Sequence, residues 1–203
     1  MRRMVGLGAA GIAMLFAATS VWAQQPKVNV RGTIDAVDGA VLSTKSRDGT
    51  MMKVKLADNV AVRGVVKMAL ADVKVGSYVG VATMPQADGS LKALEVLIFP
   101  DAMRGVAEGH KPWDLQPTSQ MTNANVEVMV AGKDGQELSL KYKDGEKKII
   151  VPPDVPVVTF VPGDKGELKP GAKIVIIGAT KLEDGTVEAA GVNVGRDGIM
   201  PPM

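Results

Sequence analysis

Apolar and polar residues alternate along most of this chain, in short runs separated by Asp-Gly pairs. In the run Lys53-Val54-Lys55-Leu56, two lysines alternate with two apolar residues, as in a strand with one buried face. Asp-Gly between such runs is a strong hairpin signal, because a type I′ turn needs positive φ at both central residues. The pattern predicts ten strands, at about Val28–Val37, Ala40–Ser46, Thr50–Leu56, Tyr78–Thr83, Leu91–Phe99, Asn125–Ala131, Glu137–Lys143, Lys147–Val151, Lys173–Thr180 and Thr186–Val194.

This order of strands and turns occurs twice in the chain. The three Asp-Gly pairs of the first half recur 96 residues later in the second half, and Asp58 is matched by Asp154 at the same offset. The repeat therefore predicts two homologous domains, 24–100 and 125–196. Between the third and fourth strands we expect a short helix at Met68–Val73 in the first copy, and only a turn at Pro162–Leu168 in the second. The pairs are Asp38-Gly39, Asp48-Gly49 and Asp88-Gly89, repeated as Asp134-Gly135, Asp144-Gly145 and Asp184-Gly185.

Five strands with a short helix or turn before the fourth strand predict an all-β, OB-like barrel. We expect two such five-stranded OB-like β-barrels in tandem, joined by an ordered linker at residues 101–124, with a tail at residues 197–203. The segments VKVGSYVGVATMPQADGSLKALEVLIF and LKPGAKIVIIGATKLEDGTVEAAGVNV resemble the closing hairpin of small secreted bacterial OB-like domains of unknown function. This resemblance implies an architecture, and it implies no activity.

The first 23 residues have the pattern of a secretory signal peptide. Arg2 and Arg3 precede an apolar run from Val5 to Phe16, and Val21 and Ala23 occupy the −3 and −1 positions of a small-residue cleavage site. The run is shorter than the roughly 20 residues that span a bilayer. We therefore expect Sec-type export to the periplasm or the medium, without stable membrane insertion after cleavage.

Composition argues against two classes of function. The chain has no cysteine and one histidine, and it contains no Gly-x-Ser-x-Gly, phosphate-loop or HExxH motif, so we expect a protein that is not an enzyme. Without residues 1–23, the 22 acidic residues are balanced by 22 basic ones, and the few aromatic residues are scattered. A neutral chain without an aromatic stacking surface does not favour binding to nucleic acid.

The 101–124 linker contains the rare residues of the chain. Trp113 is costly to leave in water, so it is predicted to pack between the two domains, with His110 as a hydrogen-bonding neighbour. A second interpretation is a metal site. Two thioethers, from Met103 and Met121, and the imidazole of His110 suit Cu(I), whereas no other cofactor is expected.

The first domain also has a basic face on its second and third predicted strands, where OB-folds usually bind ligands. Such a face is either solvated or a weak site for an anionic ligand. The sequence thus predicts an exported binding or interaction module, whose partner is an unknown envelope protein or an anionic ligand. The alternative is a soluble accessory protein for periplasmic copper handling associated with transport. The residues of the basic face are Lys45, Arg47, Lys53 and Lys55.

Overall fold

A computed structural model describes residues 25–203, and the predicted signal peptide lies outside them. The fold is all-β, and each of the ten predicted strands is present. Two further strands, β6 and β10, were not predicted, and β3 is much longer than expected. The strands are β1 (Lys27–Asp38), β2 (Val41–Ser46), β3 (Met51–Met68), β4 (Tyr78–Pro85), β5 (Leu91–Ile98), β6 (Gly109–Pro112), β7 (Gln120–Gly132), β8 (Gly135–Tyr142), β9 (Gly145–Val151), β10 (Val157–Pro162), β11 (Lys173–Lys181) and β12 (Val187–Gly195).

Five strands close into a first barrel, in the order β12-β11-β1-β2-β3 and back to β12. All neighbours are antiparallel except β3 and β12, which pair in parallel. Alternate residues point inward and form one apolar core, because strand side chains alternate between the two faces. This core includes Ile34, Leu42, Val54, Ile174 and Val192, all buried.

The strands β5, β4, β7, β8 and β9 form a second ring of the same order. Its parallel closure between β5 and β9 is short, with register partners Leu91 with Ile149 and Lys92 with Ile150. The interior again holds one apolar cluster, which includes Val81, Val96 and Leu140.

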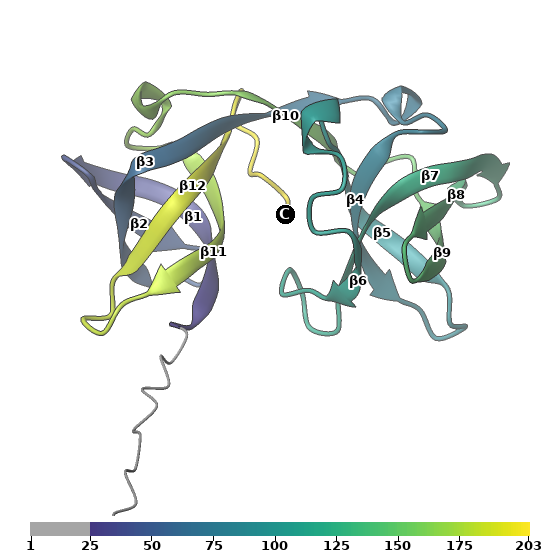
Figure 1. Cartoon of the computed structure of the whole chain (residues 1–203), viewed down its shortest axis with the longest axis horizontal. Coiled ribbons are helices and arrows are strands. Elements are labelled where there is room, and N and C mark those ends of the chain that lie inside the picture. Colours follow the sequence, from purple (N-terminus) through teal and green to yellow (C-terminus); the bar gives the residue numbers. More distant parts are fainter. Residues whose placement is uncertain (1–24) are drawn as a thin grey trace, which may run out of the picture.

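The two copies of the repeat exchange their closing hairpins, so the predicted domains 24–100 and 125–196 do not coincide with the two rings. The first ring takes β1 to β3 from the first copy and β11 and β12 from the second. The second ring takes β7 to β9 from the second copy and β4 and β5 from the first. Figure 1 shows the consequence, two bodies bridged at the top by the far half of β3 and by β10.

The exchange occurs because β3 does not end at Leu56, where the pattern predicted a strand end. The following residues, up to Met68, are rich in valine, which favours extended structure. The strand therefore continues into the second ring, and β10 returns along it, with antiparallel register partners from Met68 with Val157 to Arg63 with Pro162.

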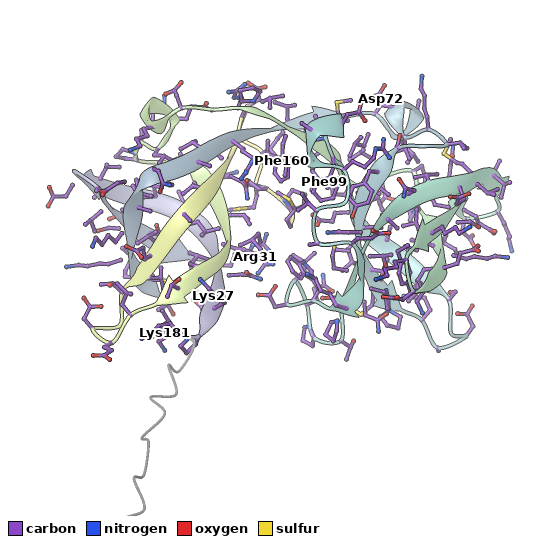
Figure 2. The ribbon with its side chains drawn as sticks, viewed as in Figure 1. Lys27, Arg31, Asp72, Phe99, Phe160 and Lys181 are labelled. Carbon is purple, nitrogen blue, oxygen red and sulfur yellow. The ribbon has the colours of Figure 1, made fainter. Side chains whose placement is uncertain are left out.

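A third apolar cluster lies between the two rings. It joins Tyr78, Phe99 and Phe160 with Val175 of the first ring, and it includes the C-terminal Met203, which is 4% exposed. Phe99 and Phe160 meet edge to face, with ring centroids 6.2 Å apart, and Figure 2 shows them in the upper part of the junction. Residues 197–203, predicted as a tail, thus end in a buried contact between the rings.

The Asp-Gly turns have a different geometry from the predicted type I′. Asp48, Asp88 and Asp184 keep negative φ, and only the glycine that follows each of them has positive φ. Each of these carboxylates accepts the backbone N–H of the residue two positions later, at 2.9 Å. The aspartates therefore stabilise their turns. Their pKa values are lowered first by hydrogen bonds from the hydroxyl groups of Ser46, Ser90 and Thr186, and then by the backbone N–H bonds.

Three connecting segments were predicted: the one between β3 and β4, the one between β5 and β7, and the one between β10 and β11. Both copies have one 3-10 turn, at Leu70–Asp72 and Lys165–Glu167, where a short helix and a turn had been expected. Part of the predicted linker forms strands: Gly109–Pro112 is β6, which pairs with the start of β7, and β7 begins at Gln120, inside the predicted linker. Within residues 25–203 no helix is long and apolar enough to span a bilayer.

Candidate functional site

A cavity of about 250 Å3 lies between the two rings, and its lining comes from both of them and from the linker. Most of the lining is apolar. Two basic side chains and two amides complete the wall, and no Asp or Glu side chain lines it. The lining includes the aromatic residues Phe99, Trp113 and Phe160, the methionines Met103, Met121 and Met203, the basic residues Arg63 and Lys111, and the amides Asn123 and Asn193.

The second ring contributes its outer sheet face to this cavity. Across that face Ala82, Met121 and Lys111 are register partners on β4, β7 and β6, so their side chains project to the same side. In the next row Gly80 faces Asn123. A side chain on Gly80 would meet the Asn123 carbonyl at 2.8 Å and the Phe99 ring at 3.1 Å, so the glycine lets these two side chains reach the cavity wall.

The first ring contributes a matching outer row. Arg31, Val175, Asn193 and Arg63 are successive register partners on β1, β11, β12 and β3. Their side chains point away from the barrel core, because core residues such as Ile174 and Val194 occupy the alternate positions. The closing hairpin of the second copy thus places Asn193 beside Arg63 of the first copy.

Two polar atoms at the cavity have no partner among the described residues. Asn193 is 6% exposed, and its side-chain carbonyl accepts no hydrogen bond. The indole N–H of Trp113 is buried and donates none. A buried polar group without a partner costs about 1–3 kcal/mol, and such groups are rare in native structures. The cavity therefore offers one acceptor and one donor in a mostly apolar wall.

Trp113 and its neighbour Asp114 connect the linker to the first ring. The Arg31 guanidinium lies 5.6 Å from the Trp113 ring centroid and donates to both Asp114 oxygens, at 2.7 and 3.0 Å. Burial raises the pKa of Asp114, but hydrogen bonds from Arg31 and Asn29 outweigh it, so the pKa is lowered overall. Figure 2 shows Arg31 pointing from the first body toward the second. This contact holds Trp113 against the cavity.

The structure separates His110 from the two methionines predicted to share a metal with it. His110 faces Thr122 across β6 and β7, and its Nδ1 lies 2.8 Å from the Thr122 hydroxyl. Met121 projects to the opposite face, because neighbouring residues of a strand alternate. Burial, followed by the charge of Lys147, lowers the pKa of His110. Met103 and Met121 line the cavity instead with Met203.

His110 lines a separate hollow of about 630 Å3 on the second ring. Its charged side chains are Glu137, Glu146, Lys147 and Lys148, two of each sign, so the hollow has no net charge that selects a ligand. Among the residues that the structure describes, no three His, Asp or Glu side chains are grouped to hold a metal ion.

The predicted basic face is divided. Lys45, Lys53 and Lys55 are exposed on the outer side of β2 and β3, and Lys55 lies 4.0 Å from Glu188. Arg47 lies beyond the end of β2. Burial lowers the pKa of Arg47, the charge of Arg31 lowers it further, and the charge of Glu95 raises it. Arg47 therefore interacts with charged groups at the junction of the rings. The structure thus leaves three lysines on this face.

Comparison with protein-family models, curated proteins and solved structures finds no match for this chain. The cavity residues that sequence reasoning missed include Arg63, Lys111, Asn123, Phe160, Asn193 and Met203. The valine-rich run after Leu56 was a signal for the longer strand that carries Arg63. Nothing in the sequence indicated that Asn193 lines the cavity, because its position depends on which ring receives the hairpin of β11 and β12.

Proposed function

We propose that this protein is an exported, non-enzymatic binding module of the bacterial periplasm, and that it holds a small ligand in the cavity between its rings. The fold supports an OB-like assignment, because each ring has the order of an OB barrel, with one parallel pair between its third and fifth strands. On this proposal two OB-like barrels exchange hairpins and share one site.

The observation that carries the proposal is the pair of unpartnered polar atoms in an apolar cavity. Ligand pockets are mainly apolar and contain a few polar groups that fix orientation. The Asn193 carbonyl and the Trp113 indole N–H fit this description. The volume of about 250 Å3 lies just below the range of about 300–1,000 Å3 for drug-sized ligands, so we expect a ligand of one or two rings.

The test uses the protein without residues 1–23, in which Trp113 is the only tryptophan. We expect the neutral probe 1-naphthaleneacetamide to quench Trp113 fluorescence saturably. Its amide N–H reaches the Asn193 carbonyl, so Asn193→Leu weakens binding about fivefold, the value of one hydrogen bond. Asn59→Ala, at an exposed position outside the cavity, leaves affinity unchanged. Absence of saturable quenching, or equal affinity in the Asn193 variant, would contradict the proposal.

Copper handling is the second candidate function, in a revised form. Met103, Met121 and Met203 line one cavity, and thioethers are soft ligands that suit Cu(I). The organic ligand is favoured because methionine also lines apolar cavities without binding metal. For copper, Cu(I) titration would show weaker binding in Met121→Leu and unchanged binding in His110→Ala. No saturable Cu(I) binding by the unmodified protein would exclude this function.

A further inference from the structure

The cavity wall has an imbalance of charge. Arg63 and Lys111 both line it, and no Asp or Glu side chain does. Met203 also lines it, and its main-chain oxygen accepts a hydrogen bond from Arg31, so it does not pair with Arg63 or Lys111. Within residues 25–203 neither of them forms an ion pair or a side-chain hydrogen bond. Each lies instead near an aromatic ring, with the Arg63 guanidinium 6.0 Å from the Phe160 centroid and the Lys111 ammonium 5.9 Å from that of Trp113.

Three of the other four arginines of the described chain have a carboxylate partner, and Arg47 has none. Arg31, Arg104 and Arg196 each form an ion pair with a carboxylate, at 2.7 to 3.1 Å. Arg196, for example, donates two hydrogen bonds to Glu167. Arg63 has no such partner, although it lies at the junction of the rings, where charge–charge interactions are screened less than on an open surface. The positive charge is therefore available to a ligand.

The two basic groups lie on opposite walls of the cavity. Arg63 belongs to β3 of the first ring and Lys111 to β6, which pairs with the second ring. Asn193 is the register partner of Arg63 on β12, so its unpartnered carbonyl lies on the same wall. Paired residues of neighbouring strands lie about 5 Å apart. A ligand whose anionic group meets Arg63 can therefore also use a neighbouring hydroxyl or N–H to donate to Asn193.

From this arrangement we infer that the cavity selects small amphipathic anions. The apolar body lies among Phe99, Phe160 and Trp113, and a carboxylate or similar anionic head meets Arg63 and Lys111. Guanidinium groups match carboxylates in shape and charge, whereas Lys111 acts as a point charge. This inference rests on the proposed function, because it assigns a ligand class to the same cavity.

The test compares 1-naphthylacetate with the neutral 1-naphthaleneacetamide, by quenching of Trp113 in the protein without residues 1–23. We expect the anion to bind about tenfold more tightly than the amide, because charge-assisted contacts to Arg63 and Lys111 outweigh the hydrogen bond that only the amide donates to Asn193. Raising salt from about 50 to about 500 mM reduces this preference, because it screens the partly exposed charges. Arg63→Gln and Lys111→Gln each reduce it at low salt, while Arg63→Lys largely retains it. Lys92→Gln, which removes an exposed lysine from outside the cavity, leaves it unchanged.

The possible results separate this inference from the proposed function. Equal affinities for the two probes would overturn the anion preference and leave the cavity as a neutral-ligand site. A preference that persists in both glutamine variants would also overturn it, because the charge would then act from elsewhere. If neither probe quenches Trp113 saturably, the proposed function fails and this inference fails with it. Circular dichroism of each variant establishes that it is folded.

Discussion

Cleavage of the folded protein between Pro117 and Thr118 is expected to leave two fragments that do not separate. A protease site inserted there lies in the exposed loop between β6 and β7. The first ring needs β11 and β12 from the C-terminal fragment, which pair with β1 and β3. The second ring needs β4 and β5 from the N-terminal fragment. Separation therefore requires both barrels to open, which also exposes their cores.

The measurement is size-exclusion chromatography with light scattering after cleavage, followed by urea titration. We expect one species with the mass of the intact chain. Its fragments should separate only at the urea concentration at which the circular dichroism of the strands is lost. Two barrels that each used one copy of the repeat would give the opposite result. Their fragments would be held only by the junction and the short strand β6, and they would separate while still folded.

Engineered disulfides test the exchange in the uncut chain, which has no cysteine of its own. Thr33 and Lys173 are register partners on β1 and β11, within the reach of a disulfide. We expect the pair Thr33→Cys and Lys173→Cys to oxidise readily. The control pair is Thr33→Cys with Tyr78→Cys. Tyr78 pairs with Asn125 in the second ring as Lys173 pairs with Thr33 in the first, so it would lie beside Thr33 if the first copy closed its own barrel. Oxidation of the control pair instead would show that the hairpins are not exchanged.

The exchange also explains how far the sequence could predict the fold. Alternation located ten strands, because each has one face on a core and one outside. Alternation does not say which ring receives a hairpin, since both copies have the same pattern and either hairpin fits either barrel. The decision lies in the segments after Leu56 and before Pro162, which pair with each other as extended strands. The valine-rich run from Val60 to Val66 was the available signal.

The candidate site was less predictable than the fold, because its residues meet only when the hairpins are exchanged between the rings. Trp113, Met103 and Met121 were selected because they are rare residues in the linker, and all three line the cavity. His110 was grouped with them because it is near in sequence, yet strand alternation directs it to the opposite face. Asn193 is distant in sequence, and only the exchanged hairpin brings it to the cavity.

Glu95 is expected to make the protein less stable as the pH rises. This residue of β5 is fully buried at the junction, and neither of its carboxylate oxygens has a hydrogen-bond partner among the described residues. Burial raises the pKa of Glu95 to about 8, although the charges of Arg31 and Arg47 act in the opposite direction. An unfolded glutamate has a pKa near about 4.3. Between these values the folded protein binds the proton and the unfolded chain does not, so the free energy of unfolding decreases as pH rises.

The window from pH 7 to 9 isolates this effect. The pKa of His110 is lowered by burial, so it is neutral in the folded protein there, and burial raises the pKa of Tyr78 to about 12. In urea unfolding, the free energy should fall by about 1.4 kcal/mol for the one unit between pH 7 and the Glu95 pKa, and then level off. Glu95→Gln removes the charged form and should be nearly independent of pH, and more stable than the unmodified protein at pH 9. Glu188→Gln, at a partly exposed position beside Lys55, should keep the full pH dependence. If Glu95→Gln loses stability over this window as the unmodified protein does, the carboxyl of Glu95 is not the group that titrates.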